Sequence, residues 1–163
     1  MNIKKSNRRK LREKCLQVLY GYEMNGEGLS ILINGTFSDV PSGPDKSFAE
    51  KLINTTISHR DEFDRLISKR VNNWEMERIA LIDKLLLRLG IAELIYFDDI
   101  PPKVSINEVL EISKEYSTSN SSKFINGILD AILNELKSEG KLIKSGRGLI
   151  DESLPKKNEN NDK

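Results

Sequence analysis

The segment from Glu75 to Phe97, EMERIALIDKLLLRLGIAELIYF, is apolar almost all the way round a helix. A helix of this kind belongs in the middle of a bundle, where other helices cover every side of it. The sequence DDIPPK, which follows from residue 98, ends the helix because a residue before proline disfavours the helical conformation. The segment therefore predicts one central, buried helix.

Other segments repeat their apolar residues with the same helical spacing. The first runs from about Asn7 to Glu23, with Ser6 as its cap and the turn NGEG after it. Further helices are predicted to start at Asp45 or Ser47, at Asp61, at Ser105 (with Glu108 completing a capping box) and at Lys123. The short apolar piece LSILI follows the first turn, and residues 34–47 are expected to form a loop.

These patterns predict an all-α fold of six or seven helices. No segment combines alternation of apolar and polar residues with β-branched enrichment, so a sheet is not expected. The length of 163 residues suits one domain, or two small halves that share a core. From Gly140 onward the chain is polar and charged, and residues 140–163 are expected to be a disordered tail.

Charge is distributed unevenly along the chain. Residues 1–14 hold seven basic residues and one acidic residue, although the net charge of the whole chain is only +1. Positive charge at the start of a helix opposes the helix dipole, so this cluster is not explained by stability. It indicates a basic arm that binds a polyanion, with a solvated helix start as the plain alternative.

The sequence contains little that suggests catalysis. His59 is the only histidine and is expected at the surface or in packing, and the only cysteine, Cys15, lies on the apolar stripe of the first helix. No phosphate-binding glycine motif precedes a helix. No apolar run is long enough to span a bilayer, and the N-terminus lacks the apolar core of a signal peptide. We expect a cytoplasmic protein that is not an enzyme, with no metal, cofactor, membrane association or small-molecule substrate.

Three blocks of the sequence together resemble the NusB family of bacterial transcription antitermination factors. They are RRKLREKCLQVLYGYE, then IDKLLLRLGIAEL continuing through IPPKVSINEVLEISKEYS, and SSKFINGILDAI. The match runs from about Asn7 to Leu136. It implies a helical domain over residues 1–139, made of two packed three-helix bundles at about 6–70 and about 74–138.

The resemblance also implies a function and partners. The family binds the boxA element of ribosomal RNA transcripts as single-stranded RNA, together with the small-subunit ribosomal protein NusE. Other Nus factors and RNA polymerase are then indirect partners. No cofactor-binding domain follows, so the methyltransferase version of this domain is not expected.

The matched positions imply particular site residues. The residues implied in RNA binding are Arg8, Arg9, Lys10, Arg12, Lys123 and Phe124. Tyr20 and Asp83 match positions expected at the surface for the partner protein. Arg8 and Arg12 lie one helical turn apart, so their guanidinium groups are expected to share one edge.

Each of the less certain residues has a structural alternative. Phe124 has core spacing with Ile128 and could be buried, and Tyr20 could be buried as well. Asp83 could form an internal ion pair with Lys84 or Arg88. Trp74 is expected to pack between the two halves.

Two other functions compete with RNA binding. The first is a helical interaction scaffold whose basic helix contacts an acidic protein or an anionic membrane surface. The second, a small ribonuclease, lacks the clustered acid–base residues that its mechanism needs.

Overall fold

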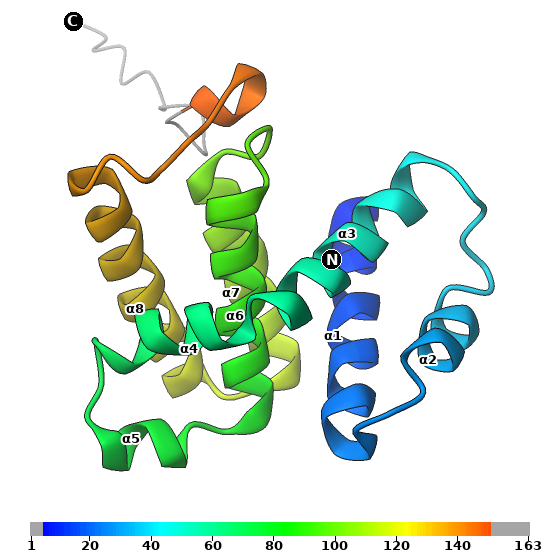
Figure 1. Cartoon of the computed structure of the whole chain (residues 1–163), viewed down its shortest axis with the longest axis horizontal. Coiled ribbons are helices and arrows are strands. Elements are labelled where there is room, and N and C mark those ends of the chain that lie inside the picture. Colours follow the sequence, from blue (N-terminus) through cyan, green and yellow to red (C-terminus); the bar gives the residue numbers. More distant parts are fainter. Residues whose placement is uncertain (1–4, 151–163) are drawn as a thin grey trace, which may run out of the picture.

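The computed structural model describes residues 5–150, which form eight α-helices and one 3₁₀-helix and contain no strand (Figure 1). The helices are α1 (Asn7–Asn25), α2 (Leu29–Thr36), α3 (Pro44–Ser58), α4 (Arg60–Ser68), α5 (Asn73–Arg78), α6 (Leu81–Tyr96), α7 (Pro102–Tyr116) and α8 (Ser119–Ser138), and the 3₁₀-helix is η1 (Gly146–Leu149). The predicted all-α class is confirmed, with one α-helix more than the upper estimate.

Local sequence signals account for the ends of α1. The Ser6 side chain accepts a hydrogen bond from the backbone N–H of Arg9 at 3.1 Å, as its position predicted. Gly26 ends the helix in the left-handed conformation, with φ of 73°, which favours glycine. The piece LSILI, which follows this turn, lies inside α2.

The long segment from Glu75 to Phe97 is two helices and not one. α5 ends at Arg78, and Ile79 and Ala80 have extended backbone before α6 begins. Asn72 caps α5 in a capping box with Glu75. The apolar pattern of the segment did not indicate this separate short helix. The part that forms α6 is buried along most of its length, as predicted for a central helix.

The predicted starts of four helices differ from the structure. α8 begins at Ser119 and not at Lys123, because the Thr118 side chain caps it by accepting a hydrogen bond from the Ser121 N–H. α7 begins at Pro102, because proline suits the first turn of a helix, and Ser105 is a buried residue inside α7 that does not cap it. α4 begins at Arg60, with no side-chain cap from Asp61, and α3 begins at Pro44. The segment between α2 and α3 is shorter than the predicted loop.

The helices pack as two groups that share α6 (Figure 1). α2 and α3 pack on α1, whereas α6, α7 and α8 pack on one another, and α1 and α3 also lie against α6. α4, which the predicted bundle at 6–70 included, packs on α6 and α8. Its buried Phe63 and Ile67 and the ion pair of Asp64 with Arg88 explain this placement.

One continuous apolar cluster joins the two groups. It includes Leu16 from α1, Leu52 from α3 and Leu86 from α6, all at most 1% exposed. Gly90 allows α8 to approach α6 closely, because a Cβ at this position would lie 3.0 Å from a methyl carbon of Leu129. The chain therefore folds as two helical halves with a common core.

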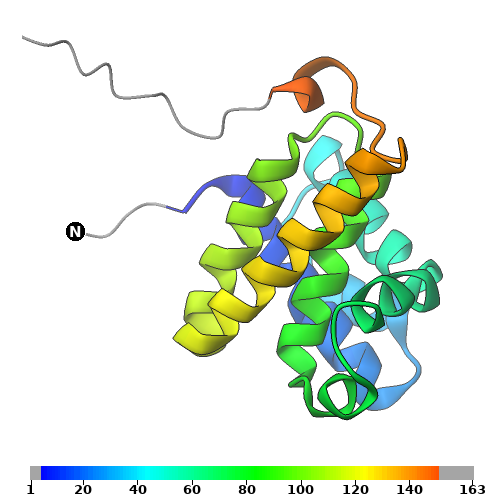
Figure 2. The same ribbon diagram turned by 90° about the vertical axis from the view of Figure 1, so that its left-hand side faces the viewer.

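The predicted tail differs from the structure over its first part. Lys141–Ile150, which we call the C-terminal strap, runs back to the carboxyl end of α6 and includes η1 (Figure 2). The Ser145 N–H donates to the carbonyl oxygen of Asp98 at 3.0 Å, and Gly148 is buried. Composition alone did not predict these contacts. The remainder of the predicted tail, 151–163, lies outside the described residues.

Candidate nucleic-acid interface

The basic residues of α1 divide into paired and unpaired groups. Arg8 and Lys10 are exposed, and neither forms an ion pair within residues 5–150. The guanidinium carbon of Arg8 lies 4.0 Å from the centre of the Phe48 ring, a cation–π contact that holds the side chain at the surface. These two side chains can therefore bind an external anion without breaking an internal ion pair.

Arg9 is at the surface but is already bound to a carboxylate. Its Nε and Nη2 donate to the two oxygens of Glu108 at 2.8 and 3.0 Å, joining α1 to α7. This hydrogen bonding raises the pKa of Arg9 above its ordinary value. The two side chains are only 21% and 16% exposed, so an RNA phosphate would compete with Glu108 for one edge of Arg9.

Arg12 is not placed where it could bind RNA, and its predicted role needs correction. The side chain is 4% exposed, and it donates two 2.7 Å hydrogen bonds to Glu93, which is fully buried in α6. Burial by itself lowers the pKa of Arg12, but attraction to Glu93 outweighs it and the pKa is raised overall. Arg8 and Arg12 thus share a side of the helix, with guanidinium carbons 4.0 and 5.4 Å from the Phe48 ring, but only Arg12 is buried against Glu93 of α6.

Other basic residues near the start of the chain are also neutralised internally. Lys5 forms ion pairs with Glu13 and Glu115 at 2.8 and 2.7 Å, and Lys14 pairs with Asp39 at 3.1 Å. The positive strip on α1 is therefore narrower than the sequence suggested.

Lys123 lies on a groove that also includes Arg9. The groove runs between α7 and α8, has a volume of about 680 Å³, and is bordered by Lys114, Asn107 and Asn126 as well. Lys123 is exposed and forms no ion pair within the described residues, whereas Lys114 pairs with Glu111 at 2.6 Å. The tertiary structure thus brings residues 9 and 123 together at one groove.

Phe124 is 37% exposed and lies on a different hollow from Lys123. Consecutive residues of a helix point about 100° apart, which separates the two side chains. The Phe124 hollow has a volume of about 430 Å³ and is also lined by Trp74, Arg78 and Asp83. The alternative that Phe124 is a buried core residue is wrong.

Asp83 is 6% exposed and is held by two serines. The hydroxyl groups of Ser117 and Ser121 each donate to one of its oxygens at 2.7 Å, which ties the start of α6 to the junction of α7 and α8. The alternative of an ion pair with Lys84 or Arg88 is not formed within residues 5–150, where Arg88 binds Asp64 instead. Asp83 therefore has a structural role at this junction, and its burial disfavours the direct partner contact that the matched position implied.

Tyr20 and Trp74 are also available at the surface. Tyr20 is 40% exposed on α1, so its predicted availability to a partner agrees with its position. Trp74 is 60% exposed and does not pack between the halves. The guanidinium of Arg78 lies 3.7 Å from its ring centre, one helical turn away in sequence. The four-residue spacing of Trp74 and Arg78 in the sequence permits this contact, but it does not show whether the tryptophan is buried.

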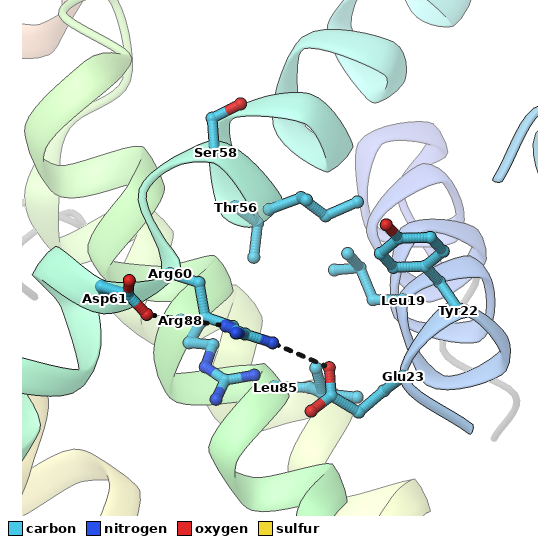
Figure 3. Close-up of a pocket in the computed structure, with 10 residues that line it drawn as sticks. Leu19, Tyr22, Glu23, Thr56, Ser58, Arg60, Asp61, Leu85 and Arg88 are labelled. Atoms are coloured by element: carbon cyan, nitrogen blue, oxygen red, sulfur yellow. Dashed lines mark ion pairs between the residues drawn. The ribbon is translucent and has the colours of Figure 1, made fainter. Parts of the chain in front are cut away.

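A separate hollow of about 230 Å³ lies between α1, the α3–α4 junction and α6 (Figure 3). In Figure 3 Arg60 extends between Glu23 and Asp61, with ion-pair distances of 3.9 and 3.8 Å. Tyr22 and Glu23 line the hollow from α1, on the side opposite Asp61. None of the predicted site residues lines this hollow, and its charges are balanced.

Within residues 5–150, no group of three or more histidine, cysteine or carboxylate side chains is arranged to hold a metal ion. None of the helices in this part of the chain is both long and apolar enough to cross a membrane. His59 stacks on Tyr96 with ring centres 4.2 Å apart, which is a packing role.

Known proteins match this chain over most of its length. The NusB family model matches residues 9–134. The transcription antitermination protein NusB of Chloroherpeton thalassium is 51% identical over 155 residues, covering 94% of this chain and 72% of that protein. NusB of Salinibacter ruber is 44% identical over 149 residues, covering 89% and 92%.

Solved structures agree with these relatives. NusB of T. maritima superposes with a TM-score of 0.73 at 34% identity, covering 81% of this chain and 94% of that one. A crystal structure of antitermination factors NusB and NusE in complex with dsRNA matches with a TM-score of 0.71 at 27% identity, covering 79% and 97%. With matches in sequence, fold and length, this chain belongs to the NusB family of transcription antitermination proteins.

Proposed function

We propose that this chain binds boxA-type single-stranded RNA together with NusE, and promotes antitermination during ribosomal RNA synthesis. The observation that carries the proposal is a set of exposed cations that form no ion pair within residues 5–150, on α1 and beside the α7–α8 groove: Arg8, Lys10 and Lys123. The planar, forked guanidinium group of arginine and the compact ammonium group of lysine both suit phosphate oxygens. A relative of similar fold has been solved with NusE and RNA, which supports the same class of partners here.

The proposed RNA surface is smaller than the one implied by the matched positions. One edge of the Arg9 guanidinium group belongs to this RNA surface, because the other edge is hydrogen-bonded to Glu108. Phe124 offers an exposed ring on which an unpaired base can stack. Arg12 is left out because Glu93 and the surrounding core cover it.

Few side chains beside these cations are suited to hydrogen-bond with the edges of RNA bases. The chain alone is therefore expected to bind RNA weakly. Three phosphate contacts to single-stranded RNA correspond to a log–log salt slope of about −2. Sequence preference would then come from NusE extending the RNA surface. Other Nus factors and RNA polymerase would join through that complex.

The test is a titration of labelled boxA RNA and a scrambled RNA, each with and without NusE. We expect NusE to tighten binding to boxA RNA and to leave binding to the scrambled RNA nearly unchanged. Equal affinities for the two RNAs in the presence of NusE would refute the proposal.

A pair of matched variants locates the surface. Arg8→Ala/Lys10→Ala removes one arginine and one lysine from α1, and should flatten the salt slope by about 1.4. Arg65→Ala/Lys137→Ala removes the same charges from exposed positions on α4 and α8, and should leave the slope unchanged. Equal changes of the salt slope in the two variants would show that the total positive charge matters and the position of the removed cations does not.

Tyr20 is the proposed contact for NusE, because a tyrosine supplies apolar area with a polar tip and this one is exposed. Tyr20→Ala should weaken the capture of NusE while leaving the weak binding of RNA alone unchanged. The rival function, binding to an anionic membrane, predicts flotation with anionic vesicles, which the RNA-binding proposal does not.

A further inference from the structure

The C-terminal strap is anchored at the carboxyl ends of two helices, α8 and α6. The backbone N–H groups of Lys141 and Leu142 donate to the carbonyl oxygen of Leu136 at 2.8 and 3.2 Å. The ammonium group of Lys144 then donates to the carbonyl oxygens of Glu93 and Phe97 at 3.0 and 2.7 Å. The carbonyl oxygens of Glu93 and Phe97 also accept backbone N–H groups at 3.3 Å, so Lys144 adds a second donor to each at the end of α6.

A second set of contacts orients the part of the strap that contains η1. The hydroxyl of Ser145 donates to the Asp98 carboxylate at 2.9 Å, in addition to the backbone hydrogen bond to the same residue. Gly148 packs directly on this turn, and a Cβ at position 148 would overlap the carbonyl oxygen of Asp98. Arg147 therefore projects from a short segment that is held on both sides.

The strap brings Arg147 to the start of α1. Arg147 is exposed and lines a hollow of about 380 Å³ together with Ser6, Arg8 and Glu108. Asp99, from the turn before α7, lines it too. Residues 8 and 147, from opposite ends of the described chain, thus border one hollow.

The charges in this hollow favour an external anion. Arg8 and Arg147 form no ion pair within residues 5–150, whereas Glu108 is already bound by Arg9. Arg12 at the floor of the hollow is held by Glu93. Asp99 is the one acidic group on the rim without an ion pair in the described part of the chain, so it reduces the positive charge but does not cancel it.

We propose that Arg8 and Arg147 form a phosphate clamp that binds the backbone of the RNA at the hollow between α1 and the C-terminal strap. Two planar guanidinium groups on either side of a hollow can hold phosphate oxygens with paired hydrogen bonds. The strap is then a positioning element for RNA binding. This inference rests on the proposed function, because it names a further contact for the same RNA.

The experiment measures the affinity of the full chain with NusE for boxA RNA between 0.1 and 1 M salt. Arg147→Ala should flatten the salt slope by about 0.7, which amounts to about a five-fold additional loss of affinity at 0.1 M relative to 1 M. Lys141→Ala is the matched control, since it removes a strap cation that does not line the hollow, and it should bind as the parent chain does. Asp99→Asn should tighten binding.

A positional test uses Gly148→Ala, which keeps Arg147 but displaces the turn that carries it. It should lose RNA affinity as Arg147→Ala does, with the far-ultraviolet circular dichroism of the helices retained. Parent-like binding by either Arg147→Ala or Gly148→Ala would overturn the clamp. If Arg8→Ala still weakens binding in that case, the proposed function stands without the strap, whereas failure of the parent chain to prefer boxA RNA refutes the proposed function itself.

Discussion

Arg8 and Arg12 are one helical turn apart on α1 and have different surroundings. Arg8 lies on the ring of Phe48 at the surface, whereas Arg12 is buried against Glu93. Ser105 also donates to Glu93, at 3.0 Å, so this buried group joins α1, α6 and α7. The same residue type is therefore available at the surface at one position and part of a buried ion pair at the other.

Replacing Arg12 should destabilise the protein. Arg12→Ala leaves the Glu93 carboxylate buried without its charge partner, which typically costs about 3–5 kcal/mol in the free energy of unfolding. The exposed Lys10→Ala should change that free energy by less than about 0.5 kcal/mol. Urea unfolding followed by circular dichroism measures both, and equal stabilities for the two variants would contradict the buried ion pair.

At the scale of helices, the ends of α6, α7 and α8 meet at Asp83. Its carboxylate accepts hydrogen bonds from Ser117, which ends α7, and Ser121, in the first turn of α8. Asp83→Ala leaves two hydroxyl groups without their acceptor, and should lower the free energy of unfolding by about 1–3 kcal/mol. The exposed Glu77→Ala serves as the control, and an Asp83→Ala protein as stable as that control would show that the junction needs no carboxylate.

The strap makes a prediction about pH. Burial lowers the pKa of Lys144 to about 8, although the carboxylates of Glu93, Asp98 and Asp99 act in the opposite direction. Between pH of about 8 and the ordinary lysine pKa, Lys144 is protonated when the strap is detached and neutral when the strap is attached. Attachment of the strap should therefore strengthen as the pH rises through this range.

The measurement is an NMR titration of the lysine side-chain amines. Lys144 should titrate well before Lys141, whose pKa is raised by its hydrogen bond to Glu139. Titration of Lys144 at or after Lys141 would mean that its amine is not held against the end of α6.

At the scale of the whole molecule, the shared core and the Arg12–Glu93 pair predict that both halves unfold together. Cys15 reports on the first half, because it is fully buried and burial raises the pKa of its thiol. Trp74 lies on α5, which packs on α4 and through α4 on α6 and α8, so Trp74 reports on the second half. Thiol labelling and tryptophan fluorescence should give the same urea midpoint, and earlier exposure of Cys15 would show that the halves are independent.

Membership in the NusB family confirms the predicted resemblance and the prediction that the chain is not an enzyme. It also gives the whole molecule a role in antitermination. Within that role, the exposed cations and the strap define the surface that the RNA experiments test.

The amino-acid sequence alone determined the helical class, the central position of α6, and the cap at Ser6 with its turn at Gly26. These depend on side-chain spacing and on hydrogen bonds within a few residues, which a local pattern contains. The resemblance of three sequence blocks was enough to identify the family.

The tertiary structure decided which charged residues remain available. Arg12 pairs with Glu93 and Arg9 with Glu108, partners 81 and 99 residues away. Arg147, from the other end of the described chain, lines the same hollow as Arg8. Such pairings depend on which helix faces meet, and no local pattern contains that information. The physical reason is that a charge binds an outside partner only where folding has not already buried it or given it a partner within the protein.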